Sequence, residues 1–242
     1  MLSMSIPLAE RLRPRTLDEY IGQAHLVGQN GVFRKFLETG NVPSFILWGP
    51  PGVGKTTLAK IVATTLKRPF YTLSAVTSGV KEVREVLESA RKQKFFDSKP
   101  PILFIDEIHR LSPIVEEYLY SAMEDYKIDI VLDKGPSARS IQIELAPFTL
   151  IGATTRSGLL TSPLRARFGI QCHLEYYDSS VLKGIVNRSA RILDVSIDSD
   201  AALEIALRSR GTPRIANALL RRVRDFAMVK GEGHIDLDIT RF

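Results

Sequence analysis

The sequence has little cysteine and no long apolar run. Its 242 residues include a single cysteine, Cys172, which excludes an internal disulfide and favours a reducing compartment. Cys172 lies in a probable strand at 169–174, so we expect a small residue of the core or sheet edge rather than a nucleophile. The chain shows neither an apolar run of about 18 residues nor a charged-then-apolar leader. We therefore expect a cytoplasmic protein that spans no membrane.

Internal repeats and low-complexity segments are also missing, and the composition is that of an ordinary globular protein. Hydrophobic residues make up 44% of the chain and charged residues 25%, which is enough for a core in one large domain or two smaller ones. The formal net charge of +6 fits a phosphate-bearing partner, and it fits a solvated basic surface equally well.

A glycine-rich turn at 49–56 separates an apolar run at 45–48 from a helical pattern. Glycine has no Cβ, so backbone N–H groups can surround a phosphate, and the helix directs its positive N-terminal end at the same anion. This P-loop pattern predicts binding of ATP or ADP, with Lys55 at the β and γ phosphates and Thr56 on Mg²⁺. The nucleotide-binding residues expected here are Gly49, Pro51, Gly52, Val53, Gly54, Lys55, Thr56 and Thr57.

Two acidic residues follow a second apolar run at 102–105. Four apolar residues without alternation indicate a strand buried on both faces, as in a parallel α/β sheet. Ligands of such sheets gather at the carboxyl ends of the strands. We therefore expect Asp106 to bind Mg²⁺ and Glu107 to polarise the attacking water. A merely exposed acidic pair is the alternative, which the buried strand and the upstream P-loop disfavour.

Hydroxyl and arginine side chains follow the next apolar strand, at 148–153. Thr155 is the candidate for orienting the lytic water, with Thr154 a close second. A short helix and turn at 159–169 carries Arg165 and Arg167. An arginine there could complete the ATP site of a neighbouring subunit, although composition alone is equally consistent with two ordinary surface arginines.

The remaining segments complete an α/β pattern followed by helices. Thr16 should cap a helix that Gly22 ends, and another helix is expected at 31–38. Nearby basic residues could contact nucleotide or simply be solvated: Arg11, Arg13 and Arg15. Further elements are expected at 70–73, 80–92 and 112–125, and then, from residue 175, helices at 178–193, 198–209 and 211–226. The exposed face of this helical region is basic, with Arg208, Arg210, Arg214, Arg221, Arg222 and Arg224.

Two alternating segments, 128–133 and 140–145, flank a turn-rich stretch at 134–139. Alternation of apolar and polar residues predicts a β-hairpin with one apolar face. The hairpin could pack on its own domain, which the pattern slightly favours, or project and offer that face to a partner.

Together these features resemble the AAA+ ATPases, whose fold is a three-layer α/β/α parallel sheet with a small C-terminal helical lid domain. The back half resembles the RuvB family of Holliday-junction branch-migration motors, with the resemblance carried by segments 104–113, 123–126, 134–141, 152–158 and 210–217. The front half instead resembles the RarA family of replication-fork ATPases, through segments 6–14, 44–49 and 74–84.

The two resemblances meet within 102–111, a strand that both families share. This seam favours an engineered chimera over a natural divergent member. The expected domains are an ATPase domain at 1–174, RarA-like to about 103 and carrying the hairpin insertion 128–145, and a lid domain at 175–242. The RuvB winged-helix domain is not expected within the chain, so we expect DNA binding to be weak or lost.

The resemblance also implies roles for particular residues. Arg11, Tyr20 and Ile21 would contact adenine, Thr155 would sense the γ-phosphate, Arg167 would act as a finger in the neighbour's site, and Arg214 would be the sensor of the lid. The hairpin would bind a RuvA-like partner, and the subunits would form a hexameric ring. The implied function is ATP hydrolysis in DNA recombination and repair, of the branch-migration helicase type. The alternative is a chimera that binds nucleotide without assembling or remodelling DNA.

Overall fold

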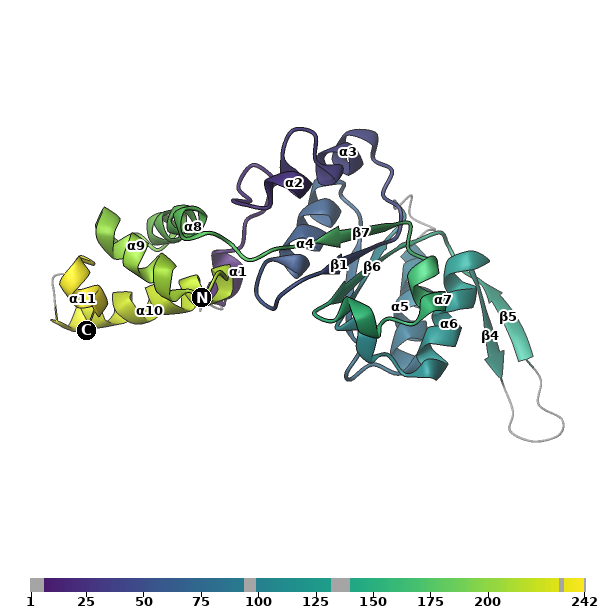
Figure 1. The fold of residues 1–242 in the computed structure, drawn as a ribbon. Helices are drawn as coiled ribbons and strands as arrows, with labels where there is room; N and C mark the ends of the chain where they lie inside the picture. The colour runs from purple at the N-terminus through teal and green to yellow at the C-terminus, as the bar shows by residue number, and fades with distance from the viewer. Residues whose placement is uncertain (1–6, 94–98, 132–139, 231–232, 242) are drawn as a thin grey trace, which may run out of the picture. The chain divides into compact units, whose positions relative to one another are not determined.

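The computed structural model describes residues 7–93, 99–131, 140–230 and 233–241. These residues form two compact units (Figure 1). The described residues within 1–34, 50–57 and 174–242 form the lid unit, and those within 35–49 and 58–173 form the sheet unit.

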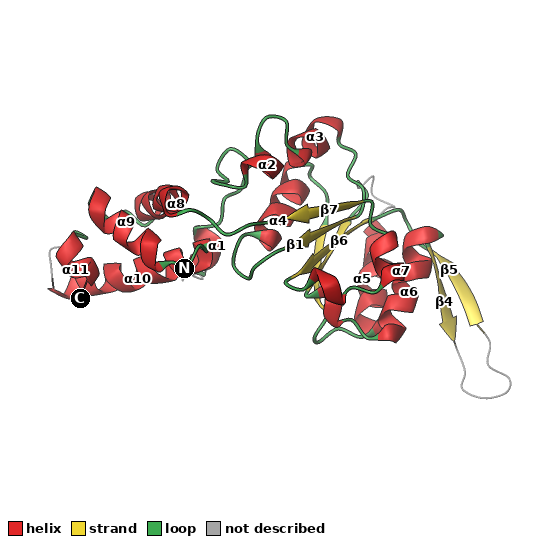
Figure 2. Cartoon of the chain, viewed as in Figure 1, coloured by secondary structure: helices red, strands yellow, loops and turns green. Residues whose placement is uncertain are grey.

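The sheet unit is built on five parallel strands in the order β2-β3-β6-β1-β7. Figure 2 labels three of them, β1, β6 and β7. The strands are β1 (Phe45–Trp48), β2 (Phe70–Ser74), β3 (Ile102–Asp106), β6 (Thr149–Thr154) and β7 (Ile170–His173). The three central strands are buried along their whole length except for the last residues of β1 and β3. This burial explains their unbroken apolar runs, because each face of a central parallel strand is covered.

Helices cover the sheet. One large apolar cluster joins Leu103 and Ile105 of β3 to Val83 and Leu87 of one helix and to Leu119 of another. Leu58 and Val62 of the helix after the P-loop have no exposed surface. The helices are α3 (Val32–Thr39), α4 (Lys55–Thr65), α5 (Val80–Gln93), α6 (Pro113–Glu124) and α7 (Ser162–Ala166), with single 3₁₀ turns at Ile108–Arg110 and Ser157–Leu159. The predicted α/β fold is confirmed.

The predicted hairpin is present as strands β4 (Lys127–Val131) and β5 (Ser140–Glu144), which pair antiparallel. Its base packs on its own unit, since Ile128 is 1% exposed and its cross-strand partner Ile143 lies against the apolar cluster. Two residues before Ile143 in the same strand, Ile141 is 49% exposed. The packing expectation therefore holds for the base, and the expected turn at 134–139 lies outside the described residues.

The lid unit contains the helical region expected at the C-terminal end. Its core is formed by small and aliphatic residues such as Leu182, Val186, Ala201, Ile205 and Leu220. A single bridge joins Ile197 to Ile235. The helices are α8 (Ser179–Ile192), α9 (Ser199–Arg208), α10 (Pro213–Lys230) and α11 (Leu237–Arg241), with α1 (Leu8–Arg11) and α2 (Ala24–Val27) from the N-terminal segment.

The helix predicted at 16–22 does not form. The Thr16 hydroxyl accepts from the Glu19 N–H at 3.3 Å, and the Glu19 carboxylate accepts from the Arg15 N–H at 3.0 Å. These bonds close one turn, but Leu17 and Tyr20 are both buried and Gly22 takes a φ of 92°. Burial of these side chains therefore overrides the local capping signal, and short helices lie on either side, at α1 and α2.

Cys172 lies in β7 and is 2% exposed, which confirms the prediction of a core residue. Burial raises the pKa of its thiol to about 11. Within the described ranges, no helix combines the length and the apolar character needed to cross a membrane.

Candidate active site

The P-loop follows β1 directly, and glycines give it its shape. Gly52 and Gly54 have φ values of 81° and 109°, a region that favours glycine. A Cβ on Gly54 would lie 2.4 Å from the Tyr20 hydroxyl, and one on Gly52 would lie 2.9 Å from Cβ of Arg214. Both glycines are therefore required by close neighbours as well as by backbone conformation. The second contact places Arg214, at the start of α10, against the loop.

Two tyrosines hold the P-loop from within the lid unit. The Val53 carbonyl accepts from the Tyr20 hydroxyl at 3.2 Å and from the Tyr177 hydroxyl at 3.0 Å, and the two hydroxyls lie 3.1 Å apart. Burial is the main cause of a raised pKa for both tyrosines. Both hydroxyls therefore stay protonated and available as donors at neutral pH. Segments far apart in the sequence thus meet at one carbonyl of the loop.

The other predicted nucleotide-binding residues of the lid unit have varied surroundings. Lys55 is 7% exposed and its ammonium donates to the Pro50 carbonyl at 2.8 Å. Arg13 donates to the Thr57 hydroxyl at 2.9 Å. Arg11 is exposed. The remaining residues, Pro51, Thr56 and Ile21, are at least partly accessible.

In the sheet unit, three adjacent strands end side by side, and two of them end in polar residues. Asp106 is the last residue of β3, Thr154 is the last of β6 and Trp48 is the last of β1. Because the strands are parallel, these ends lie at one edge of the sheet. The Gly49 N–H donates to the Thr154 carbonyl at 3.2 Å, so the first residue of the P-loop is tied to that edge.

Glu107 lies at the centre of a polar cluster at this edge. Its φ of 52° is left-handed, and its Oε2 accepts from the Thr155 hydroxyl at 3.2 Å. Nδ1 of His109 lies 3.3 Å from the same oxygen and 2.8 Å from Oγ1 of Thr154. Burial lowers the pKa of His109, and the opposing effect of Glu107 is smaller. The ring is therefore neutral at neutral pH.

Arg167 lies elsewhere on the sheet unit, at the end of α7. Its guanidinium lies 4.0 Å from the ring centre of Tyr120, pairs with Glu124 at 2.9 Å and donates to the Pro163 carbonyl at 2.9 Å. Both Tyr120 and Glu124 belong to α6. The structure therefore brings Glu107 and Thr155 together, whereas the Arg167 guanidinium contacts Tyr120 and Glu124 of α6.

A second network fixes the start of α7. Glu116 is 7% exposed, and its carboxylate accepts from the hydroxyls of Tyr120 and Thr161 at 2.7 and 2.8 Å. Thr161 also caps α7 through the Leu164 N–H at 3.3 Å. Glu116, Tyr120 and Glu124 are spaced four residues apart and so share one face of α6, which contacts α7 at both ends.

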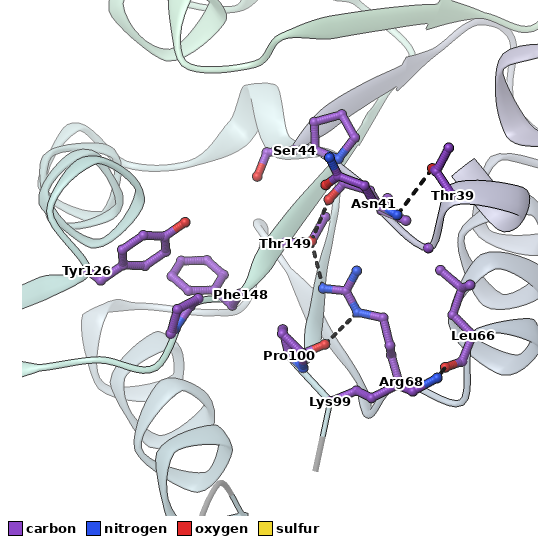
Figure 3. Close-up of a pocket in the computed structure, with 14 residues that line it drawn as sticks. Thr39, Asn41, Ser44, Leu66, Arg68, Lys99, Pro100, Tyr126, Phe148 and Thr149 are labelled. Carbon is purple, nitrogen blue, oxygen red and sulfur yellow. Dashed lines mark hydrogen bonds between the residues drawn. The ribbon is translucent and has the colours of Figure 1, made fainter. Parts of the chain in front are cut away.

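A pocket of about 570 Å³ lies at the opposite edge of the sheet, before the first residues of β1, β3 and β6 (Figure 3). Arg68 donates there to the carbonyls of Pro100 and Pro101 and to the Thr149 hydroxyl. Lys99 donates to the Leu66 carbonyl at 2.9 Å. The side chains of Arg68 and Lys99 thus donate to backbone carbonyls of the protein itself. We therefore assign the pocket a structural role.

Two family models match the chain. The model described as Holliday junction DNA helicase RuvB P-loop domain matches residues 12–174, and the RuvB AAA lid domain model matches residues 177–242. The first match alone covers more than half of the chain. The chain belongs to the RuvB family. It is therefore a nucleotide-binding P-loop ATPase.

Individual RuvB proteins are similar over nearly the whole chain. The Holliday junction branch migration complex subunit RuvB of Parabacteroides distasonis is 61% identical over 234 residues, which are 96% of this chain and 67% of that protein. The same subunit of Flavobacterium johnsoniae is 54% identical over 99% of this chain and 69% of its own length. The solved structure of the Thermotoga maritima RuvB Holliday junction branch migration motor is 43% identical, with a TM-score of 0.80 over 96% of this chain and 71% of that one. The chain thus spans about two thirds of its relatives' length.

These RuvB matches give no support to a RarA-like front half or to a chimera. One RuvB model runs from residue 12 to residue 174, across the proposed seam at 102–111. Of the segments that suggested RarA, 44–49 and 74–84 lie inside this RuvB model, and 6–14 overlaps its start.

Sequence reasoning missed several residues of this RuvB-family site. Tyr177 lies more than 120 residues from the P-loop that it contacts, and no local pattern marks it. His109 follows the acidic pair within two positions, so the spacing could have suggested it. Glu116 lies in the first turn of the helix expected at 112–125, where an acidic side chain is commonly exposed, and no local pattern marks its burial.

Proposed function

We propose that this chain is the ATP-hydrolysing core of a Holliday-junction branch-migration motor that acts in DNA recombination and repair. The observation that carries the proposal is the polar edge of the sheet, where the P-loop leaves β1 and Asp106 and Glu107 leave β3. Membership in the RuvB family also supports the proposal. We propose an ATPase domain at 1–174 and a lid domain at 175–242, and we keep the expectation of a cytoplasmic protein.

The proposed phosphate site consists of residues 49–57. Gly52 and Gly54, whose φ angles are positive, have no Cβ atoms that would obstruct the N–H groups of the loop. Lys55 would neutralise phosphate charge. Mg²⁺ would be held by the Thr56 hydroxyl and the Asp106 carboxylate. This donor set fits because Mg²⁺ prefers oxygen ligands and usually keeps several waters and phosphate oxygens.

The proposed hydrolytic step relies on the cluster around Glu107. Oε2 of Glu107 is already bonded to Thr155, so its carboxylate has a fixed direction from which to orient and polarise water. Thr155 would also contact the γ-phosphate. Such groups act on phosphoryl transfer by positioning and by electrostatic stabilisation.

The remaining roles extend the proposal to neighbouring groups. Arg214 would report nucleotide state to the lid, in keeping with its contact with Gly52. Arg11, Tyr20 and Ile21 would lie near adenine. Arg167 would enter the ATP site of the next subunit in a hexameric ring, and within this chain α6 holds its guanidinium through Tyr120 and Glu124.

We also propose that hairpin 128–145 binds a RuvA-like partner. The support is the 49% exposure of Ile141 beyond the packed base of the hairpin, since an exposed apolar side chain on a paired strand is available to a partner. We further propose that these 242 residues bind DNA weakly. Titration with a branched duplex, with and without ATP, measures this affinity.

The test is ATPase activity as a function of protein concentration. Wild-type turnover per subunit should rise with concentration, whereas Arg167→Ala should lose at least about a thousandfold of the assembled rate. Arg221→Ala, which removes an exposed arginine of α10, is the control and should keep the wild-type rate. Normal hydrolysis by Arg167→Ala under assembling conditions would refute the proposal that Arg167 completes the ATP site of the neighbouring subunit.

Nucleotide binding is tested separately by calorimetric titration. Lys55→Ala should weaken binding of ATP and ADP strongly, because an ammonium group beside the phosphates is lost. Unchanged affinity in this variant would refute the phosphate role of Lys55. A mass measurement with and without ATP checks assembly, and monomers in both states would leave the motor without complete sites.

A further inference from the structure

A histidine that the proposed mechanism does not use lies against its central carboxylate. The His109 side chain is 7% exposed and belongs to the 3₁₀ turn Ile108–Arg110 that follows the acidic pair. Nδ1 of this ring is its contact atom, at 2.8 Å from Oγ1 of Thr154 and 3.3 Å from Oε2 of Glu107. The ring thus connects the residue after β3 to the last residue of β6.

Hydrogen-bond accounting selects the tautomer of this ring. An ionised carboxylate only accepts hydrogen bonds, so Glu107 needs a donor at Nδ1. The hydroxyl of Thr154 already accepts from the Arg156 N–H at 2.9 Å and has a second lone pair for another donor. A ring with hydrogen on Nδ1 serves both acceptors and requires the Thr154 hydroxyl hydrogen to point away from the ring. The other tautomer can accept that hydrogen but sets a nitrogen lone pair against the carboxylate.

The position of Glu107 makes such support necessary. Its left-handed φ of 52° is uncommon for a residue with a side chain. Thr155 and His109 both approach Oε2, while Oε1 accepts no hydrogen bond from the described residues. Two contacts on one oxygen restrict the carboxylate, and the side chain as a whole keeps 33% exposure.

We propose that His109 is a positioning residue, which aims the Glu107 carboxylate by bridging it to Thr154 at the end of the neighbouring strand. This inference rests on the proposed function, because it assumes that Glu107 polarises the attacking water. His109 itself touches neither water nor nucleotide in this role.

The first test compares three substitutions in steady-state ATPase assays. His109→Leu removes the donor at similar volume and should lower kcat by about 10- to 100-fold, the scale of a misplacement near 1 Å, with nucleotide affinity unchanged within about twofold. His109→Asn, whose amide N–H can replace Nδ1–H, should recover most of the lost rate. Arg110→Leu, on the exposed next residue, should match wild type.

A double variant separates this inference from the proposed function. If Glu107→Gln hydrolyses ATP normally, the proposed role of Glu107 and the positioning role of His109 are both refuted. If Glu107→Gln is inactive but His109→Leu keeps the wild-type kcat, only the inference is refuted. When both residues act as one unit, Glu107→Gln combined with His109→Leu should be no slower than Glu107→Gln alone. Equal losses in His109→Leu and His109→Asn would also refute the inference.

The tautomer supplies a readout that needs no turnover. Nitrogen-15 NMR of the full chain should show His109 neutral near pH 7 with hydrogen on Nδ1. In Glu107→Gln the carboxylate is gone, and the proportion of this tautomer should fall. Hydrogen on Nε2 in the wild-type protein would overturn the proposal.

Discussion

The two tyrosines at the Val53 carbonyl permit a prediction about stability. Replacing either one with phenylalanine removes a hydroxyl, but the carbonyl keeps the other donor at 3.0 or 3.2 Å. Each single variant should therefore lose only about 0.5–1.5 kcal/mol of unfolding free energy, the net value of a hydrogen bond. The double variant removes both hydroxyl donors from a fully buried residue.

The double variant should consequently cost more than the sum of the singles. Loss of hydroxyl donors from a buried carbonyl costs about 1–3 kcal/mol beyond the lost bonds, so we expect a coupling energy of about 1–2 kcal/mol between Tyr20 and Tyr177. Urea unfolding of the four proteins measures it. Tyr176→Phe, at an exposed neighbour, is the control and should lie within about 0.5 kcal/mol of wild type. Additive losses would refute the shared-carbonyl reasoning.

The same pair has a signature at alkaline pH. Burial raises the pKa of Tyr20 and Tyr177 in the folded chain above the unfolded value near 10. A raised folded pKa gives stability that is fully present below the unfolded pKa and is lost as pH rises toward the folded pKa. Wild-type stability should therefore fall above about pH 10 more steeply than that of the double phenylalanine variant. Equal slopes would contradict this linkage.

Three further predictions concern other parts of the chain. Native Cys172 should react with an alkylating agent far more slowly than the urea-unfolded chain, because burial raises its thiol pKa to about 11; equal rates would contradict its placement. Gly54→Ala should weaken nucleotide binding at least about tenfold, since its Cβ would meet the Tyr20 hydroxyl at 2.4 Å, whereas Gly40→Ala, with nothing within 4 Å, should bind normally in calorimetry. Arg68→Leu should lower the unfolding free energy by about 1–3 kcal/mol without changing ATP turnover, and a change in turnover alone would argue against a structural role.

Much of the site was predictable because its signals are local. Glycines that need positive φ, an acidic pair after a buried strand and a hydroxyl after the next strand are all properties of short segments. For that reason the sequence predicts Gly52 and Gly54 in a P-loop, and it predicts Asp106 and Thr155 at the carboxyl ends of two neighbouring strands. The helix predicted at 16–22 failed for the opposite reason, since burial of Leu17 and Tyr20 by distant residues outweighed a local capping signal.

The sequence by itself determined the fold class, the P-loop and the succession of strands and helices, because hydrophobic period and glycine chemistry act over a few residues. Only the tertiary structure decided which side chains meet. Tyr177 reaches Val53, His109 bridges Glu107 to Thr154, and α6 holds Arg167. Such contacts join segments tens of residues apart, and their partners depend on packing directions that no local pattern encodes.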